Sequence, residues 1–206
     1  MKKLCIIGAS GFAREAMCII KDLGWEHDFF AFFQSDRFHK EEKIYGYDVL
    51  PLSRFNPREH KAVIAIADPA IREKIVKEMP EGTEYYSLIH PNVIISSYNV
   101  EIGEGAIICA GSILTCDIKM GRHTILNLAT TIGHDCTIGD FFTTTPAVNI
   151  SGRCTIGDRV YIGTNAALRG HNNICNDVTI GMGAVVLKDI ESPGVYIGNP
   201  LKQLIK

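Results

Sequence analysis

The 206-residue sequence lacks the features that mark several large classes of protein. No apolar run approaches the ~20 residues that cross a bilayer, so we expect no transmembrane segment. The run LCII near the N-terminus is followed by Gly8, Arg14 and Glu15, and is too short for a secretory signal. Neither sign of charge predominates, because 21 basic residues nearly balance 23 acidic ones. No overall field therefore favours nucleic acid or an anionic membrane as a partner.

Paired cysteines are also missing. The seven cysteines are an odd number and contain no C-x-x-C pair. This usage is typical of reduced thiols, not of a disulfide framework or a cysteine zinc site. We therefore expect a soluble protein in the cytoplasm.

The second half of the chain is a repeat with a period of six residues. Counting in sixes from Ile102 to Val186 visits fifteen positions, and fourteen of them are aliphatic, Thr144 being the exception. Glycine often follows the aliphatic residue, and the fourth residue after it is usually small or β-branched, as in Ala106 and Val160. A period of six fits neither a helix nor an alternating strand.

The repeat predicts a coil of triangular cross-section, in which three six-residue faces make one turn of about 18 residues. The aliphatic side chain of each face points to the axis, and glycine or polar residues let the backbone turn the corner. Residues one turn apart then stack at the ~4.8 Å spacing of parallel strands. Roughly five such turns fit between residues 102 and 188. His123, His134 and His171 are not separated by whole turns, so we expect no metal site.

Residues before the repeat alternate between short strands and helices. KLCIIG is typical of a buried strand, and a helix follows the glycine turn at 8–11. DFFAFF, KAVIAIA and YYSLI are predicted strands, and Asp68 caps a second helix that opens with Pro69. The order predicts a parallel sheet with helices on its faces. We expect a small Rossmann-like α/β unit over residues 1–88 and the coil over residues 89–206.

A sheet of this kind binds ligands at the carboxyl ends of its strands. The turn from Gly8 to Gly11 would lie there, at a helix N-terminus suited to phosphate. GASGFA lacks the third glycine of a dinucleotide fingerprint. A tight turn without a ligand is therefore the alternative interpretation.

GASG in a short α/β unit, an IHP junction, hexapeptide repeats that contain HD, and the ending GNPLK occur together in this chain. The combination resembles a group of bacterial hexapeptide-repeat sugar acetyltransferases, over essentially the whole length. The group includes sialic acid O-acetyltransferases and N-acetyltransferases of nucleotide-linked 4-amino-4,6-dideoxy sugars. The resemblance implies a left-handed parallel β-helix, a homotrimer, acetyl-CoA between neighbouring coils, and a sugar nucleotide on the N-terminal unit.

The resemblance places the catalytic histidine at His134 and its acidic neighbour at Asp135. An amine or hydroxyl must lose a proton as it attacks a thioester, and a neutral imidazole accepts one at pH 7. A carboxylate beside the ring would orient it. An exposed turn histidine without function is the alternative. Asn127 matches a position that shapes the acceptor site in the group.

The resemblance also assigns positions to the two substrates. For acetyl-CoA they are Thr143, Gly152, Thr164 and Met182. Lys188 and Lys202 would meet the coenzyme phosphates or stay solvated, and the loop at 169–173 would line the groove or form ordinary surface. For the sugar nucleotide the matching positions are Ser10, Gly11, Phe12 and Asp36.

Several of these positions depart from the pattern of the group. Phe12 replaces a histidine after GxSG, Ser35 replaces the first residue of an acidic pair, and Ala67 replaces a glycine after the third strand. Thr143 replaces a second histidine that contacts the acetyl group. These changes bear on which nucleotide and which sugar are bound.

We therefore expect an acetyl-CoA-dependent N-acetyltransferase that acts on a nucleotide-linked amino-sugar by direct transfer, in the synthesis of a bacterial surface polysaccharide. Sugar O-acetylation is the nearest alternative, because one histidine serves an amine or a hydroxyl equally. A non-catalytic protein that binds nucleotide sugars is an alternative of another class, and a zinc-dependent hydratase is a third.

Overall fold

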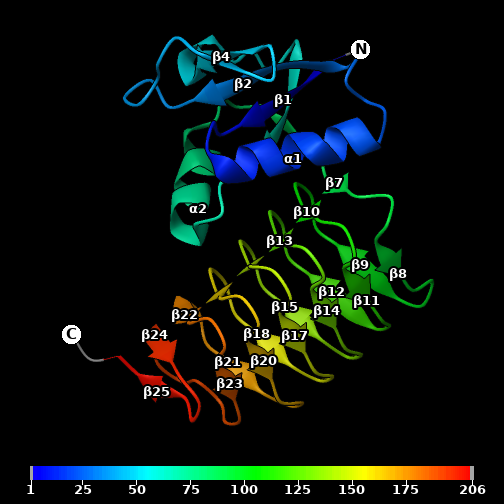
Figure 1. Ribbon diagram of the computed structural model, residues 1–206, viewed down its shortest axis with the longest axis vertical. Helices are drawn as coiled ribbons and strands as arrows, with labels where there is room; N and C mark the ends of the chain where they lie inside the picture. Colours follow the sequence, from blue (N-terminus) through cyan, green and yellow to red (C-terminus); the bar gives the residue numbers. More distant parts are fainter. Residues whose placement is uncertain (1, 205–206) are drawn as a thin grey trace.

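The computed structural model describes residues 2–204 as an α/β unit that lies alongside the first turns of a long β-coil (Figure 1). The strands of the unit form one sheet in the order β3-β4-β2-β1-β5-β6, parallel except for the β3–β4 pair. The elements are β1 (Lys3–Ile7), α1 (Gly11–Asp22), β2 (Phe29–Gln34), β3 (Lys43–Ile44), β4 (Tyr47–Pro51), the 3-10 helix η1 (Leu52–Arg54), β5 (His60–Ile64), α2 (Pro69–Glu78) and β6 (Glu84–Tyr85). No helix among residues 2–204 is long and apolar enough to cross a membrane.

The α/β unit confirms the predicted parallel sheet and both helices. The Asp68 carboxylate accepts a hydrogen bond from the Ile71 amide at 2.8 Å, which caps the first turn of α2. The hairpin of β3 and β4 was not predicted. Tyr45 and Gly46 at its tip have φ values of 52° and 86°, the left-handed pair that a two-residue hairpin turn requires.

The predicted strand YYSLI is wrong as a single element. Its first part, β6, ends at Tyr85 and pairs with β5 in the α/β sheet. Its last part is β7 (Leu88–Ile89), which pairs with β10 of the coil. Between them the Ser87 hydroxyl accepts a hydrogen bond from the Ala106 amide at 3.1 Å. The chain therefore enters the coil at Leu88, earlier than the start of the clear six-residue pattern at Ile102.

Three sheets form the three faces of the coil, and their strands are parallel except for the last pair of the first face, β24 and β25. The first face contains β7 (Leu88–Ile89), β10 (Ile107–Ile108), β13 (Ile125–Leu126), β16 (Thr143–Thr144), β19 (Tyr161–Ile162), β22 (Val178–Ile180), β24 (Gly194–Ile197) and β25 (Lys202–Gln203). The second face contains β8 (Ile94–Ile95), β11 (Ile113–Leu114), β14 (Thr131–Ile132), β17 (Asn149–Ile150), β20 (Ala167–Leu168) and β23 (Val185–Val186). The third face contains β9 (Val100–Ile102), β12 (Ile118–Met120), β15 (Thr137–Ile138), β18 (Thr155–Ile156) and β21 (Asn173–Ile174).

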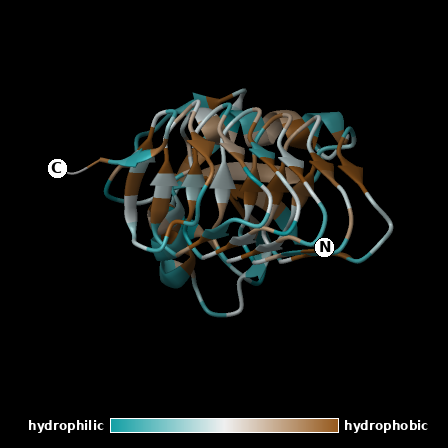
Figure 2. Cartoon of the chain, turned by 90° about the horizontal axis from the view of Figure 1, so that it is seen from below, coloured by the Kyte–Doolittle hydropathy of each residue, from teal (hydrophilic) through white to brown (hydrophobic). Residues whose placement is uncertain are grey.

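Stacking in the coil follows the predicted period. Ile132 pairs with Ile150, and Ile138 with Ile156, each one predicted turn further along the chain. Brown, apolar residues recur from turn to turn along the coil among paler, more polar ones (Figure 2), and the predicted inward residues form its continuous core. Thr144, the one polar residue in that series, is buried and accepts a hydrogen bond from the Asn127 amide at 3.1 Å. Its hydroxyl is therefore satisfied inside the core.

The corners are built differently from the prediction. The residue that turns each corner with a left-handed φ is rarely glycine: Asp135, Phe141 and Ala147 have φ values of 59°, 57° and 60°. The glycine that follows the inward residue has another function. A Cβ on Gly139 would lie 2.7 Å from the Gly157 carbonyl carbon of the next turn. Close stacking of successive turns therefore requires these glycines, whereas the strained corner position accepts several residue types.

The α/β unit covers the first face at the start of the coil. Ala16 and Ile19 of α1 pack in one cluster with the outward residues Leu88, Ile107 and Ile125 of that face. The outward residues of the third face are polar or charged, such as Lys119 and Thr137, and the second face is left uncovered by the α/β unit (Figure 1). The three corners of the coil are therefore not equivalent.

Candidate functional site

His134 and Asp135 lie at the corner between the second and third faces, which we call the catalytic corner. The His134 Nδ1 atom is 2.7 Å from Asp135 Oδ2, and both side chains are about half exposed. A carboxylate only accepts, so Nδ1 carries the proton of this bond and Nε2 of the neutral ring keeps a lone pair. The predicted pair is thus an accessible imidazole whose orientation is fixed by a carboxylate.

Gly152 forms the surface on which this imidazole rests. It follows His134 by one turn of the coil and lies at the same corner. A Cβ on Gly152 would be 2.7 Å from Nε2 and 2.8 Å from Cε1 of His134, closer than real Cβ contacts. The ring therefore occupies the space that a side chain at residue 152 would need.

Arg153 is the second neighbour of the Asp135 carboxylate. Its Nε atom is 3.6 Å from Asp135 Oδ2, and its backbone N–H donates to the His134 carbonyl at 2.7 Å. The hydrogen bond from His134, with a smaller effect of the Arg153 charge, holds the pKa of Asp135 below its ordinary value. The carboxylate is therefore ionised at neutral pH, as the orientation of the ring requires.

The predicted acetyl-CoA positions lie in three different places. Gly152 is at the catalytic corner, whereas Thr164 and the 79 % exposed Met182 lie one turn apart at the corner between the first and second faces. Thr143 is 1 % exposed, and its hydroxyl donates to the Ala67 carbonyl at 2.9 Å inside the junction of the two units. Asn127 is half-buried on the same corner as Thr164, where its side-chain oxygen accepts from the Leu128 amide at 2.7 Å.

The predicted nucleotide positions lie at the carboxyl edge of the α/β sheet, with one exception. Ser10 is exposed at the N-cap of α1 with no capping bond from its side chain, and Gly11 begins the helix. The side chain of Phe12, in contrast, is buried in the core below α1. Asp36 follows β2 and accepts hydrogen bonds from the hydroxyl and the amide of Ser53, which lower the pKa of its carboxyl.

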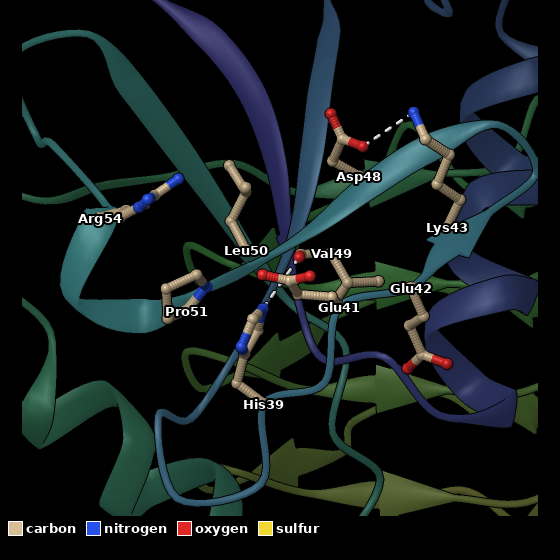
Figure 3. A pocket seen from close by; sticks show the side chains of 9 residues that line it. All are labelled: His39, Glu41, Glu42, Lys43, Asp48, Val49, Leu50, Pro51 and Arg54. Atoms are coloured by element: carbon tan, nitrogen blue, oxygen red, sulfur yellow. Dashed lines mark hydrogen bonds and ion pairs between the residues drawn. The ribbon is translucent and has the colours of Figure 1, made fainter.

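Two cavities lie near this edge. A cavity of about 300 Å³ is lined by Ser35, Asp36, Ser53 and Glu78 among others. A larger one of about 520 Å³ lies along β4, where the His39 ring is bonded to the Val49 carbonyl at 3.1 Å and Lys43 is paired with Asp48 at 2.9 Å (Figure 3). Its lining mixes both signs of charge and includes none of the predicted substrate residues.

Arg72 and Arg153 were not singled out from the sequence. Arg72 is fully buried between the two units, and the sequence offers no signal for it, because its partners in the coil lie 51 to 71 residues further along the chain. Arg153 follows Gly152, so the period of the coil would have placed it beside Asp135. Among residues 2–204 there is no group of three or more histidine, cysteine or acidic side chains placed to hold a metal ion.

Comparisons with known proteins agree with this architecture. Residues 3–79 match the family described as the PglD N-terminal domain. The curated GDP-perosamine N-acetyltransferase of Escherichia coli O157:H7 is 29% identical over 171 residues, which cover 80% of this chain and 76% of that protein.

Two solved structures are similar over nearly their whole length. WeeI from Acinetobacter baumannii AYE is 31% identical with a TM-score of 0.90, and the match covers 99% of this chain and 100% of that one. The acetyltransferase domain of PglB from Neisseria gonorrhoeae FA1090, in complex with acetyl coenzyme A, is 28% identical with a TM-score of 0.87 over 98% and 99% of the two chains. With its α/β unit, its β-coil and its relatives, the chain belongs to the hexapeptide-repeat bacterial sugar acetyltransferases.

Proposed function

We propose that this protein transfers the acetyl group of acetyl-CoA to the amine of a nucleotide-linked 4-amino-4,6-dideoxy sugar. The observation that carries the proposal is the carboxylate-oriented imidazole of His134, which rests on Gly152 at an accessible corner of the coil. The relative that acts on GDP-perosamine supports an amino-sugar as the acceptor and makes the GDP-linked sugar the first to test.

His134 acts as the general base. As the neutral amine attacks the thioester carbon, its proton passes to Nε2, while the bond from Nδ1 to Asp135 stabilises the imidazolium. The carbon–sulfur bond then breaks, and the proton leaves with the coenzyme A thiolate. The Gly152 N–H makes no hydrogen bond within residues 2–204, so it is a donor for the oxyanion. General-base catalysis of this kind contributes roughly 10²–10⁴-fold to the rate.

The catalytic corner continues as a track suited to the coenzyme arm. Gly152 and Gly170 follow His134 at intervals of one turn, and exposed Lys188 comes next. Three turns at ~4.8 Å place Lys188 about 14 Å from His134 along the axis. Two glycines leave the floor of this track open to an extended chain, and Lys188 supplies a positive charge near its end for a phosphate.

The nucleotide is proposed to bind the α/β unit of residues 1–88, above the coil domain of residues 89–206. Ser10, Gly11 and Asp36 lie where parallel sheets bind ligands, and the N-terminus of the 12-residue helix α1 favours a phosphate. Phe12 contributes to the core beneath this edge. Because the Phe12 side chain packs into this core, an apolar residue at this position does not disturb the turn at residues 8–11.

A homotrimer is proposed as the active form. His134 and the pair Thr164 and Met182 occupy opposite edges of the second face, so one chain does not bring them together. The second face and its edges expose apolar side chains, including Ile94 at 61 %, Leu128 at 46 % and Met182 at 79 %. A patch of this kind is typical of a protein interface. Packing a neighbour against it would bring the two edges together and build the site between subunits. Seven free cysteines support a reducing compartment, the cytoplasm.

The test follows coenzyme A release with a thiol reagent, using UDP-, dTDP- and GDP-linked 4-amino-sugars and free sialic acid as acceptors. We expect turnover with one nucleotide-linked amino-sugar and a loss of at least ~10²-fold in His134→Ala. His27→Ala is the matched control, since His27 is an exposed histidine of the α/β unit that also lies beside an aspartate, 3.3 Å from Asp28. Release with free sialic acid alone would assign O-acetylation instead. Unchanged turnover in His134→Ala would refute the mechanism.

A further inference from the structure

Arg72 of α2 is the largest fully buried side chain among residues 2–204. It extends from the α/β unit into the junction with the coil, and within those residues it makes no ion pair with a carboxylate. Burial lowers the pKa of its guanidinium to about 9, so the side chain is still charged at neutral pH. A buried charge is costly unless every donor is satisfied.

Oxygen atoms from both units satisfy this guanidinium completely. A guanidinium has five N–H donors, and six oxygens surround it. The contacts are Nε to the His123 carbonyl at 2.9 Å, Nη1 to the Ile66 and Ala67 carbonyls at 2.6 and 3.1 Å, and Nη2 to the Phe141 carbonyl, the Phe142 carbonyl and the Thr143 hydroxyl at 2.7, 3.1 and 2.8 Å. One planar side chain thus joins a loop of the α/β unit to two neighbouring turns of the coil.

The loop that Arg72 holds belongs to the ligand-binding edge of the sheet. Residues 65–67 directly follow β5, and the Ala65 amide donates to the Ile7 carbonyl at 2.9 Å. A Cβ on Gly8 would lie 2.8 Å from the Ala65 carbonyl oxygen, so the loop also touches the turn that leads to Ser10. Any shift of this loop therefore moves the edge where the nucleotide is proposed to bind.

Thr143 makes the connection from the coil side. Its hydroxyl accepts from Arg72 Nη2 and donates to the Ala67 carbonyl at 2.9 Å. The Ala67 carbonyl consequently receives two hydrogen bonds, one from Arg72 and one from Thr143. This position was expected to contact the acetyl group, but its single hydroxyl proton is used at the junction.

We propose that Arg72 is a positioning residue that fixes loop 65–67 against the coil, so that the nucleotide-linked acceptor is presented to a catalytic corner at one set distance. This inference rests on the proposed function. Two other polar contacts join the same units without touching the loop: Glu73 with Arg159 at 3.7 Å, and Asp22 with His90 at 2.9 Å. Together with the apolar packing of α1, they keep the units docked when Arg72 is changed. Losing Arg72 therefore frees the loop more than it separates the units.

The experiment compares two acceptors in several variants. One is the nucleotide-linked 4-amino-sugar that the wild type uses best, and the other is the same amino-sugar as a methyl glycoside. In Arg72→Met we expect the KM for the nucleotide-linked acceptor to rise at least about tenfold, because a freed loop must be ordered when the nucleotide binds, and that ordering costs affinity. The KM for acetyl-CoA and the kcat/KM for the methyl glycoside should change by less than about twofold, since His134 and its track are untouched.

Three further variants make the test decisive. Arg72→Lys should not rescue the KM, because an ammonium has three donors and cannot reach six oxygens in a plane. Thr143→Val keeps the shape of the side chain, and the remaining carbonyl oxygens still accept from every N–H of Arg72. It should raise the same KM by a smaller factor than Arg72→Met. If Arg72→Met does not fold, Thr143→Val provides the test. Glu73→Gln, which weakens the neighbouring contact, should leave the KM unchanged.

Equal losses with both acceptors in Arg72→Met and Thr143→Val would show that the residue only holds the fold, and would overturn the inference. An unchanged KM in both variants would do the same. A wild-type enzyme with no preference for the nucleotide-linked acceptor would refute the nucleotide role of the α/β unit, and the inference with it. The wild type alone therefore tests the function, and the variants test Arg72.

Discussion

Gly152→Ala is the smallest change that should disable the proposed base. The new methyl group would lie 2.7 Å from Nε2, 2.8 Å from Cε1 and 2.9 Å from Cδ2 of His134, where ordinary contact begins at 3.4 Å. The ring must therefore retreat by about 0.7 Å, the shortfall of the Nε2 separation from ordinary contact (3.4 less 2.7 Å), or swing away from Asp135. Displacements near 1 Å cost catalysis ~10²-fold, which corresponds to about 2.7 kcal/mol of transition-state stabilisation.

Stability should hardly change in this variant. The φ of Gly152 is outside the left-handed range, so alanine fits the backbone, and glycine-to-alanine changes at compatible sites alter stability by only ~0.4–1 kcal/mol. The assay is the kcat/KM for coenzyme A release, with thermal unfolding as the check on folding. Gly170→Ala is the comparison: its Cβ would meet the Gly152 carbonyl oxygen at 3.1 Å and no atom of His134, so a loss in that variant reports on the coenzyme track and not on the imidazole.

A double-mutant cycle separates this mechanism from a direct effect on the coenzyme. If Gly152→Ala acts by moving His134, it should cost almost nothing further in a His134→Ala background. A second hundredfold loss in that background would show that Gly152 acts independently of the imidazole. Full activity in the folded single variant would refute the argument that the ring must lie on a glycine.

Two more predictions concern stability and assembly. Both ring nitrogens of His123 lack a hydrogen-bond partner among residues 2–204, and burial, with the nearby arginines, lowers its pKa to about 4. Because the unfolded chain takes up a proton near pH 6.5 that the folded chain excludes, the free energy of unfolding should fall by about 2 kcal/mol between pH 7 and 5. Urea unfolding should show this loss largely absent in His123→Phe, and an equal loss in both proteins would contradict it. Sedimentation of the wild type should give a mass three times the 22.7 kDa of one chain. Ile113→Lys on the second face should reduce the mass to that of one chain, whereas Thr137→Lys on the third face should not. A wild-type monomer at micromolar concentration would exclude the trimer.

The core of the coil could be predicted from the sequence because one physical requirement repeats without interruption. Each face places its large aliphatic side chain at the same inward position, so the six-residue spacing identified Ile132, Ile150 and their equivalents directly. The reason for the glycines could not be predicted in the same way. Whether a glycine serves a left-handed corner or a close approach of two turns depends on atoms of the neighbouring turn, such as those that surround Gly139.

The junction of the two units was beyond prediction from pattern alone. Arg72 looks like an ordinary charge on an amphipathic helix, and Thr143 looks like a member of the hexapeptide series. Their contact depends on how α2 meets the coil, which no local period encodes. The pair His134 and Asp135 was identified from the resemblance. The structure adds the 2.7 Å bond between them and the neighbouring guanidinium of Arg153.

The fixed length of each turn has a consequence for how proteins of this shape can evolve. Equivalent positions on one corner are separated by a whole number of turns, so their distances along the axis are multiples of ~4.8 Å. Deleting a single hexapeptide between His134 and Lys188 would carry the lysine to a different corner. Deleting three hexapeptides, which is one full turn, would return the lysine to its original corner, one turn closer to His134. The distance between the base and the residue that binds the far end of the coenzyme can therefore change only by whole turns of the coil. Intermediate distances must come from different side-chain lengths or from loops inserted at the corners.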